Sequence, residues 1–216
     1  MRGRLIVLDG VDGCGKSTQL KHLSTWLPQS GLMPDGASLH LTKEPGGTSL
    51  GYALRSLLLD PSAEFEPEPL AELLLYAADR AQHVAQLILP ALQKGDWILC
   101  DRFSGSTYAY QGYGRELDLQ LIEQLENIAT MGIVPDLTFW LDIDLQESIS
   151  RRKEVLNDRI EDEGSDFLER VIAGFSELAR KYNWVKVNAN QEMKYVTHDI
   201  EVLLVNNRKF LQESCF

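Results

Sequence analysis

Short runs of β-forming residues alternate along the chain with longer segments in which apolar residues recur at helical spacing. The short runs predict β-strands at 5–8, 39–42, 97–100, 137–141 and 184–187. Apolar residues three or four positions apart predict helices at 16–27, 50–59, 70 to about 94, 118–129, 145–155, 165–182 and about 196–211. Strands that alternate with helices are typical of βαβ units. The pattern therefore predicts an α/β fold with a doubly wound, five-stranded and mostly parallel sheet.

Proline and glycine mark the ends of several predicted elements. Pro28 should end the first helix, and Gly132 should close the helix at 118–129. Pro90 should kink the long helix or end its regular part. The acidic, proline-rich segment 61–69 is expected to be a surface loop, and no domain linker is needed to explain it. We therefore expect residues 1–216 to form a single domain.

Composition and charge exclude several classes of protein. The chain has 216 residues, of which 44% are hydrophobic, enough to bury a substantial core. No apolar run approaches the roughly 20 residues of a membrane span, and no removable signal is expected before the first strand, so we expect a cytoplasmic protein without a membrane partner. The net charge of −11 argues against nucleic acid as a partner, because binding it requires a basic face. The three cysteines have no metal-ligand spacing, which argues against a zinc site and favours a reducing compartment.

A glycine-rich motif directly follows the first predicted strand. Residues 10–17 have the pattern G-x-x-x-x-G-K-[ST]. In such a loop the glycines allow backbone N–H groups to surround phosphate oxygens, and the helix that follows presents its positive end to them. The lysine then contacts the β- and γ-phosphates, and the hydroxyl holds Mg²⁺. We therefore expect a nucleotide and its metal ion to bind to Gly10, Val11, Asp12, Gly13, Cys14, Gly15, Lys16, Ser17 and Thr18.

Cys14 in this loop has two interpretations. Because it lies beside a helix N-terminus and two residues from Lys16, the pKa of its thiol could be lowered and the thiol reactive. Alternatively, it is a small side chain that fills a tight loop. The second interpretation is favoured, because no partner for cysteine catalysis lies nearby in the sequence.

Polar residues follow the predicted strands: Asp9, Asp12, Lys43, Glu44, Asp101, Arg102, Asp142 and Asp144. In doubly wound sheets ligands bind beyond the carboxyl ends of the strands, so we expect these residues to converge on one edge. Because phosphates are anionic, basic residues should gather there as well. The candidates are Lys16, Lys43, Arg55, Arg80, Arg102, Arg115, Arg151, Arg152, Lys153 and Arg159.

Four further segments carry, together with the phosphate loop, a resemblance to a known family. They are KEPGGT at 43–48, YAADRAQ at 76–82, DRFSGSTYAYQG at 101–112 and DRIE at 158–161. In this order they closely resemble the bacterial thymidylate kinase family over residues 5 to about 190. The resemblance implies a P-loop kinase fold with a small helical lid at about 151–163, commonly a homodimer. It also implies phosphoryl transfer from Mg-ATP to dTMP, giving ADP and dTDP.

The acceptor in that reaction is itself a phosphate, which explains why the chain can lack a histidine placed as a base. With a second pKa near 6, the acceptor phosphate is mostly a dianion at neutral pH, so no side chain needs to remove a proton from it. The difficulty is to bring two polyanions together, which requires cations and positioning.

The resemblance implies roles for individual residues. Arg102 grips the acceptor phosphate with its planar guanidinium, and Asp101 corresponds to a Walker B acid that holds the Mg²⁺ shell. Asp12 contacts the acceptor 3′-hydroxyl and can approach the metal ion. With Lys16, Arg102 and Asp12 are the catalytic candidates outside the lid. Acceptor binding is further assigned to Tyr76 stacking on thymine, Arg80 donating to a base carbonyl, Thr107 and Gln111 at the base's other polar edge, Tyr110 against the sugar 2′ position, Arg55, and Lys43.

Simpler structural interpretations exist for several of these residues. Tyr76 at helical spacing among leucines is often a core residue. The segment 107–111 could be a hydroxyl-rich turn that caps a helix. An acid such as Asp12 also stabilises a helix N-terminus without any other function, and Arg102 could form a surface salt bridge.

The basic segment 151–163 is the expected source of a catalytic cation. In the family, bacterial members without an arginine in the phosphate loop carry this cation in the lid, and the loop here has none. Arg152 and Arg159 are the candidates, although a solvated charged helix would have the same composition. Two departures from the family pattern are Lys43, where arginine is usual, and Asn188, where aspartate is usual.

Two other functions remain open on the sequence. A kinase for another nucleoside monophosphate or for a deoxynucleoside would share the phosphate loop, and a hydroxyl acceptor would need a base such as Asp9, Asp12 or Glu44. A non-catalytic nucleotide switch is less favoured, because the Asn-Lys-x-Asp base-binding motif of GTPases does not occur in the chain.

Overall fold

A parallel five-stranded sheet forms the centre of the computed structural model, which describes residues 2–152 and 158–207. The strands are β1 (Leu5–Asp9), β2 (Leu39–Lys43), β3 (Trp97–Asp101), β4 (Leu137–Asp142) and β5 (Val185–Asn188). Their spatial order is β2-β3-β1-β4-β5, and each neighbouring pair is parallel. The prediction of a doubly wound parallel sheet is therefore confirmed.

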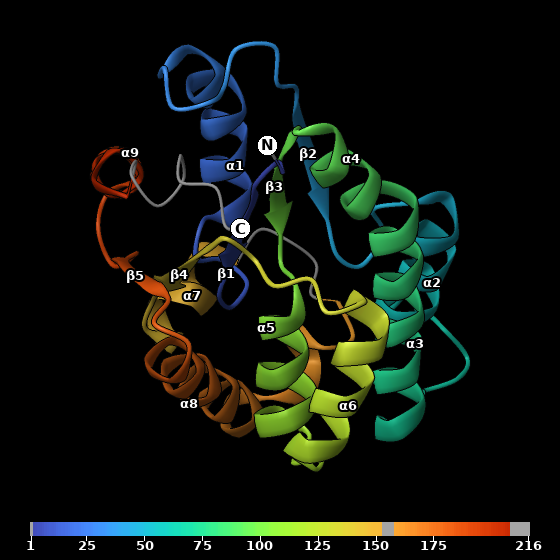
Figure 1. Ribbon diagram of the computed structural model, residues 1–216. Helices are drawn as coiled ribbons and strands as arrows, with labels where there is room; N and C mark the ends of the chain where they lie inside the picture. Colours follow the sequence, from blue (N-terminus) through green and yellow to red (C-terminus); the bar gives the residue numbers. More distant parts are fainter. Residues whose placement is uncertain (1, 153–157, 208–216) are drawn as a thin grey trace.

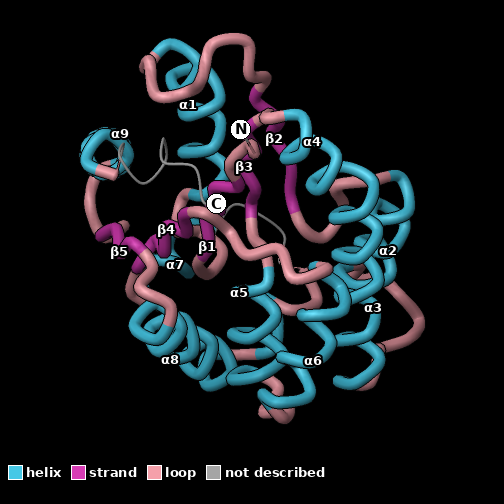
Figure 2. Tube along the Cα trace, viewed as in Figure 1, coloured by secondary structure: helices cyan, strands magenta, loops and turns pink. Residues whose placement is uncertain are grey.

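Helices cover both faces of this sheet (Figures 1 and 2). On one face lie α1 (Lys16–Trp26) and α9 (Met193–Asn206), which contact each other. The remaining helical elements are η1 (Leu27–Gln29), α2 (Ser49–Leu59), α3 (Pro69–His83), η2 (Val84–Ile88), α4 (Leu89–Lys94), α5 (Ser104–Thr107), η3 (Tyr108–Gly114), α6 (Leu119–Thr130), α7 (Leu145–Arg152), η4 (Glu161–Glu163) and α8 (Ser165–Lys181).

The central strand β1 is buried on both faces because successive side chains of a strand point in opposite directions. Leu5 and Val7 belong to an apolar cluster with η2 and α4, whereas Ile6 and Leu8 belong to a larger cluster with α1. All four side chains are at most 1% exposed. This double burial explains why β1 is a continuous apolar run.

The long helix predicted from residue 70 to 94 is interrupted as Pro90 suggested. The α3 helix continues into the π-helical turn η2, and α4 begins at Leu89 with Pro90 in its first turn. Proline has no N–H to donate to the preceding turn, so the regular hydrogen-bond pattern is lost just before it.

Residues 104–114 form a helical segment, α5 and η3, for which the sequence pattern predicted no helix. Three glycines lower its intrinsic helix propensity. The packing of α8 against η3 compensates for them, since a Cβ atom at Gly114 would lie 2.6 Å from the ring of Phe167 in α8. The predicted helix 145–155 corresponds to α7, which is described as far as Arg152, and residues 153–155 lie outside the described residues. The C-terminal helix α9 ends at Asn206.

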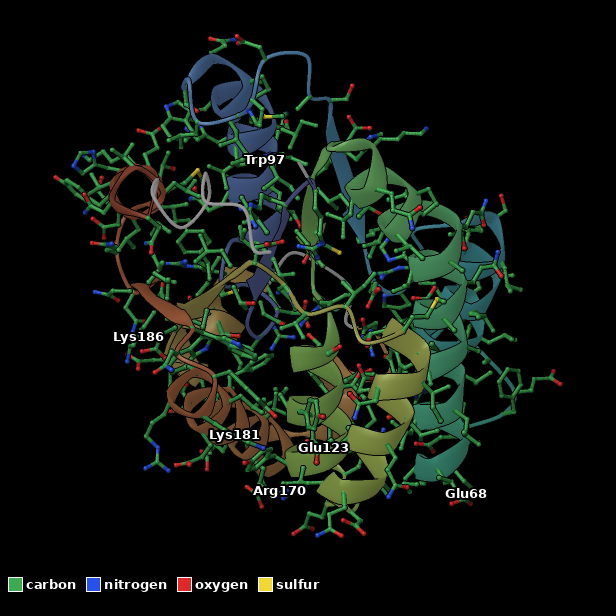
Figure 3. All side chains as sticks on the ribbon, viewed as in Figure 1. Glu68, Trp97, Glu123, Arg170, Lys181 and Lys186 are labelled. Carbon is green, nitrogen blue, oxygen red and sulfur yellow. The ribbon has the colours of Figure 1, made fainter. Side chains whose placement is uncertain are left out.

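Charged side chains surround the outer helices, as Figure 3 shows for Glu68, Glu123 and Lys181, whereas Trp97 is buried. The predicted loop 61–69 has no helix or strand as far as residue 68, and Pro69 is the first residue of α3. In the described part of the chain, no helix is both long enough and apolar enough to cross a membrane.

Candidate active site

The loop between β1 and α1 lines a first cavity, which we call the phosphate-loop cavity. Gly15 caps α1 in a left-handed conformation, with φ of 100°, which glycine adopts without strain. The ammonium of Lys16 is buried and donates hydrogen bonds to the carbonyl oxygens of Gly10 (2.9 Å) and Val11 (3.0 Å). The predicted nucleotide-binding residues from Asp12 to Thr18 all line this cavity, together with Lys43, Asp101 and part of the segment 191–196.

Ser17 and Asp101 meet in this cavity from α1 and the end of β3. The Ser17 hydroxyl donates a hydrogen bond to Oδ2 of Asp101 at 3.3 Å, and Oδ1 of Asp101 is buried with no hydrogen-bond partner. A hydroxyl beside an unsatisfied carboxylate oxygen is a donor set that suits Mg²⁺. Among residues 2–152 and 158–207, no group of three acidic, histidine or cysteine side chains could hold a metal ion alone. A metal ion here would therefore need further ligands, such as phosphate oxygens and water.

Cys14 is a buried filler of the phosphate loop. Its side chain is 1% exposed and packs in the larger apolar cluster. Burial raises the pKa of the Cys14 thiol, although the charges of Lys16 and Arg102 act in the opposite direction. The idea of an acidified, reactive thiol is therefore wrong, because the desolvation of a thiolate outweighs the nearby positive charges.

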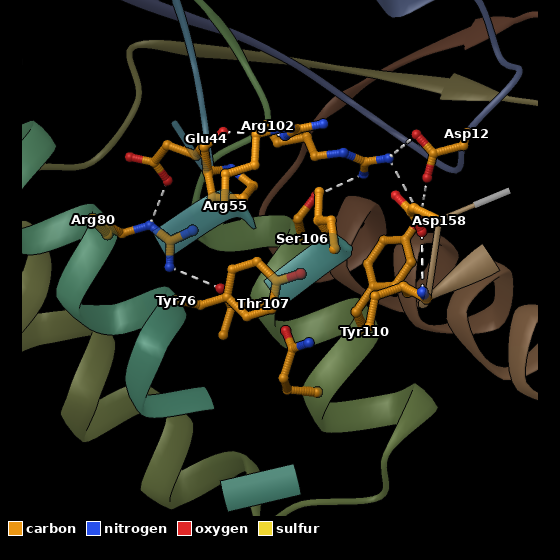
Figure 4. Close-up of a pocket in the computed structure, with 14 residues that line it drawn as sticks. Asp12, Glu44, Arg55, Tyr76, Arg80, Arg102, Ser106, Thr107, Tyr110 and Asp158 are labelled. Carbon is orange, nitrogen blue, oxygen red and sulfur yellow. Dashed lines mark hydrogen bonds and ion pairs between the residues drawn. The ribbon is translucent and has the colours of Figure 1, made fainter. Parts of the chain in front are cut away.

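A second cavity lies between α3 and the segment formed by α5 and η3, and we call it the α3 cavity (Figure 4). All predicted substrate-binding residues except Lys43 line it: Asp12, Arg55, Tyr76, Arg80, Arg102, Thr107, Tyr110 and Gln111. Lys43 lies in the phosphate-loop cavity instead. The structure thus brings together side chains from the phosphate loop, α2, α3, the end of β3, α5 and η3.

The side chain of Arg102 is held by hydrogen bonds to several different residues. Its guanidinium donates hydrogen bonds to the Gly10 carbonyl at 2.8 Å, to Oγ of Ser106 at 2.9 Å and to Oδ1 of Asp12 at 2.6 Å. Its backbone has φ of 67°, a left-handed conformation that is strained for a residue with a Cβ atom. Such strain persists only where surrounding interactions impose it, and it is found preferentially at functional sites.

Asp12 remains ionised at neutral pH. Burial alone would raise the pKa of its carboxyl, but the charges of Arg102 and Lys16 hold the pKa well below its usual range. The Tyr110 hydroxyl donates a further hydrogen bond to Oδ2 at 3.2 Å. The carboxylate is therefore a fixed negative charge between two cations, and it can accept a hydrogen bond from a ligand hydroxyl.

The inner part of the α3 cavity combines an aromatic ring with buried polar groups. Tyr76 is half-buried and lines the cavity. It is therefore not a residue of the leucine core, the alternative that its helical spacing had suggested. Burial raises the pKa of the Tyr76 phenol, which therefore stays neutral. Thr107 and Gln111 are each 2% exposed, and Gln111 donates a hydrogen bond to Glu72 at 2.9 Å.

Arg80 is embedded among carboxylates at the end of the α3 cavity. Its Nε donates a hydrogen bond to Oε2 of Glu44 at 2.7 Å, and one terminal nitrogen donates to both Oγ1 of Thr107 and a carboxylate oxygen of Glu126. Phe103 presents its ring to the guanidinium at 5.4 Å. These contacts fix the orientation of a cation beside the cavity.

Four residues line both cavities: Asp12, Glu44, Arg55 and Arg102. The two spaces therefore adjoin, with two guanidinium groups at their junction. Such a junction suits two anionic groups that must approach each other, because the cations reduce the repulsion between them.

The lid candidates have different surroundings. Arg152 lies beside the phosphate loop, where its Cγ would be 3.1 Å from a Cβ atom at Gly13. Arg159 donates a hydrogen bond to the Leu58 carbonyl at 3.0 Å, forms an ion pair with the buried Glu72, and lines neither of the two cavities. The centre of the predicted lid, 153–157, lies outside the described residues.

Comparisons with known proteins agree with this geometry. Residues 8–200 match the family described as thymidylate kinase. The chain belongs to the thymidylate kinase family. The matched residues include the phosphate loop, the residues that line both cavities, the strands β2 to β5 and the last two residues of β1.

Individual thymidylate kinases are similar over nearly the whole chain. The thymidylate kinase of Prochlorococcus marinus (strain MIT 9303) is 65% identical over 214 residues, covering 99% of each chain. That of Synechococcus sp. (strain WH7803) is 61% identical over 204 residues, covering 94% of this chain and 96% of the relative. The crystal structure of thymidylate kinase from Ehrlichia chaffeensis is 31% identical, covers 94% of this chain and 100% of that chain, and has a TM-score of 0.76.

Some side chains in this thymidylate kinase site carried no individual assignment from the sequence. Ser106, which links Arg102 to Asp9, lies inside a recognised motif but was not singled out. Arg151 lines the phosphate-loop cavity and donates to the Ala189 carbonyl at 2.9 Å, although only its basic cluster had been noted. Glu126 has no sequence signal, because its helix α6 reaches Arg80 only in the folded chain.

Proposed function

We propose that this protein transfers the γ-phosphoryl group of ATP to the phosphate of dTMP, forming ADP and dTDP. The observation that carries the proposal is the junction of the two cavities at Asp12, Arg55 and Arg102. One cavity is lined by the phosphate loop, and the other combines an aromatic ring with amide, hydroxyl and guanidinium groups. The membership of this chain in the thymidylate kinase family supports the choice of dTMP as acceptor.

In this reaction an oxygen of the acceptor phosphate forms a bond to the γ-phosphorus of ATP, and the bond from the γ-phosphorus to the bridging oxygen breaks. The acceptor is mostly a dianion at pH 7, so no general base is required. The protein contributes by holding the two phosphates in line and by offsetting their charge. Lys16 and the loop N–H groups would bind the donor phosphates, and Arg102 would bind the acceptor phosphate.

Ser17 and Asp101 are the residues that we propose for Mg²⁺. The buried, unsatisfied Oδ1 of Asp101 supports this assignment, as does the Ser17 hydroxyl beside it. When bound, Mg²⁺ would offset negative charge on the donor phosphates. The carboxylate of Asp12 lies 3.7 Å from the ammonium of Lys16, which would bind the donor phosphates. We assign this carboxylate to the acceptor 3′-hydroxyl.

For the acceptor base, we propose that Tyr76 stacks on thymine while Arg80, Thr107 and Gln111 provide polar contacts. All four line one cavity, and the three polar residues are each 2% exposed. Tyr110 lies beside Asp12 and Arg102, where its ring would meet the sugar. Arg55, which donates to the Pro45 carbonyl at 3.1 Å, and Lys43 would assist at the phosphate.

A lid at about 151–163 would complete the site within a single domain. Of its two candidate cations, Arg152 is the one beside the phosphate loop, which supports a role in phosphoryl transfer. Arg159 forms an ion pair with Glu72 of α3, which supports a role in attaching the C-terminal end of the lid to that helix.

A homodimer is supported by exposed leucines on two helices that pack together. Leu50 and Leu57 of α2, and Leu70 and Leu74 of α3, are between 43% and 50% exposed. Burial of such side chains in a partner would be favourable. Sedimentation of the wild type and of a Leu74→Glu variant would test this, with a monomeric wild type as the contradicting result. We also propose a cytoplasmic setting. Within the described residues the cysteines Cys14 and Cys100 are free and buried, which supports a reducing compartment.

The function is tested by assaying dTMP, dUMP, dCMP, AMP and thymidine as acceptors with Mg-ATP. We expect dTMP to be the best acceptor and dUMP to be poorer by roughly 10- to 200-fold, because a methyl group in an apolar pocket contributes about 1–3 kcal/mol. A Lys16→Ala variant, expected to be inactive with every acceptor, controls for contaminating kinases. Equal turnover of dTMP and another acceptor would contradict the assignment of the base site.

A further inference from the structure

His83 is a fully buried histidine at the end of α3 with both ring nitrogens engaged. Its Nδ1 lies 2.8 Å from Oε1 of Glu44, and its Nε2 lies 2.7 Å from Oγ1 of Thr42. Thr42 belongs to β2, and Glu44 follows that strand. The imidazole therefore bridges the end of β2 to the start of the loop that lines both cavities.

The hydrogen-bonding chemistry of Glu44 and Thr42 determines which ring nitrogen of His83 carries a hydrogen. An ionised carboxylate only accepts hydrogen bonds, so Nδ1 of His83 must carry the hydrogen that points to Glu44. The Thr42 hydroxyl can donate to Nε2 or accept from it, so it completes the hydrogen bonding of the ring. The ring also packs tightly against the loop, because a Cβ atom at Gly47 would lie 2.6 Å from Nε2.

The second oxygen of the Glu44 carboxylate continues the chain of contacts. Oε2 accepts a hydrogen bond from Nε of Arg80 at 2.7 Å, and the Glu44 side chain is 2% exposed. The Glu44 carboxylate is planar and rigid. The hydrogen bond from His83 to Oε1 therefore also fixes the direction in which Oε2 faces Arg80. Thr42, His83, Glu44 and Arg80 thus form one hydrogen-bonded series that ends at the α3 cavity.

We propose that His83 is a positioning residue for recognition of the acceptor base, acting through Glu44 on the guanidinium of Arg80. The inference rests on the proposed function, in which Arg80 donates to a base carbonyl. Asp79 supplies an independent tether for the same loop, since its Oδ1 accepts the Gly46 N–H at 3.0 Å. Loss of the His83 contact should therefore disturb the orientation of Arg80 more than the course of the loop.

The expected kinetic effect is specific. A base contact is made in the ground state and in the transition state alike, so weakening it raises KM for dTMP and leaves kcat nearly unchanged. ATP binds in the other cavity, and its KM should not respond. A general structural defect would instead lower kcat or raise both KM values together.

A matched pair of substitutions separates the two ring nitrogens. The amide nitrogen of asparagine occupies the place of Nδ1, so His83→Asn can retain the donor to Glu44, whereas His83→Gln places its amide near Nε2 and loses that donor. We expect H83N to stay within about threefold of the wild-type KM for dTMP, and H83Q to raise it by about tenfold, because a buried acceptor is left unsatisfied. His40→Gln is the control, since His40 forms a similar pair with Asp96 at the other end of β2.

Equal KM values for H83N and H83Q, or a parallel rise in the KM for ATP, would overturn the inference. If neither variant folds by circular dichroism, the pair Thr42→Ser and Thr42→Val decides the question, because only serine keeps the hydroxyl that orients the ring. A higher KM for dTMP in T42V than in T42S supports a role for this hydrogen-bonded series, and equal KM values reject it. A wild type that does not phosphorylate dTMP would refute the proposed function itself, which keeps the two failures distinct.

Discussion

The carboxylate of Asp12 lies 2.6 Å from the guanidinium of Arg102, although the residues are 90 positions apart. Parallel pairing places Leu8 of β1 opposite Asp101 of β3, so the segments that follow both strands emerge side by side. The left-handed turn at Arg102 then allows its side chain to reach the phosphate loop. This ion pair occupies the point where the two cavities adjoin.

Replacing Arg102 by alanine should abolish most turnover without preventing ATP binding. The guanidinium would stabilise charge on the acceptor phosphate during transfer, and loss of such a group costs about 100- to 1,000-fold in kcat. Steady-state kinetics and calorimetric titration with ATP measure the two effects separately. Loss of ATP binding together with activity would instead place Arg102 in the donor site.

A comparison with Arg102→Gly distinguishes the side chain from the backbone. Glycine relieves the strain of the positive φ angle, so R102G should unfold at a higher denaturant concentration than R102A while being equally inactive. A stability lower than that of R102A would contradict the strained conformation.

Replacing Asp101 by asparagine should weaken the metal site. We expect the Mg²⁺ concentration for half-maximal activity to rise about 10- to 100-fold, since substitution of groups that support a metal ion has effects of this size. Asp142→Asn is the matched control, because Asp142 likewise ends a strand, β4 on the other side of β1, but forms an ion pair with Lys186. The same shift in both variants would argue against a specific role for Asp101.

Replacing Glu72 by glutamine should destabilise the fold. Glu72 is fully buried and forms ion pairs with Arg115 and Arg159 and a hydrogen bond with Gln111. Removing one partner of a buried pair costs about 3–5 kcal/mol, measurable by urea unfolding at pH 7. The control is Glu66→Gln, because Glu66 contacts Arg159 from a position that is 71% exposed and should contribute less than about 1 kcal/mol.

The stability difference between the wild type and E72Q should depend on pH. Burial alone would raise the pKa of Glu72, but its hydrogen bonds with Arg115, Arg159 and Gln111 hold the pKa below its usual value. A lowered pKa in the folded state means that the ionised carboxylate stabilises the fold above the unfolded-state pKa of about 4.3, and that this contribution is lost as the pH falls further. The difference should be constant from about pH 6 to 8 and shrink below about pH 4. A difference of the same size at pH 3 would be inconsistent with an ionised Glu72.

Tyr110 should discriminate against ribose. Its ring lies 5.2 Å from the Arg102 guanidinium and would exclude a 2′-hydroxyl by steric contact. We expect Tyr110→Ala to improve kcat/KM for ribothymidine monophosphate relative to dTMP by about tenfold, while Tyr110→Phe keeps the wild-type preference. Measuring both acceptors with both variants tests the role of the ring separately from that of the hydroxyl.

Local patterns in the sequence predicted much of the fold and part of the site. The phosphate loop is recognisable because glycine, lysine and serine must follow one another at fixed spacing between a strand and a helix. The strands β1, β3 and β4 are buried on both faces, so they appear as continuous apolar runs. The ends of parallel strands share one edge of a sheet, which made the convergence of Asp12, Lys43, Asp101 and Arg102 predictable.

The helical segment 104–114 could not be predicted in this way. Its glycines oppose helix formation, and it is stabilised by packing against α8, which follows about 60 residues later in the chain. Local propensity gives no information about such a distant partner.

Residues close together in the chain are enough to predict the parallel sheet, the phosphate loop and the chemical types of side chain at the ends of the strands. Which charges neutralise one another depends instead on contacts between distant elements of the folded chain. Arg159 could have faced the phosphates, yet Glu72 holds it, and Arg80 is oriented by Glu44, Glu126 and, through Glu44, by His83. Ion pairs and hydrogen bonds of this kind join residues on different elements, and their partners are set by packing distances that no local pattern records.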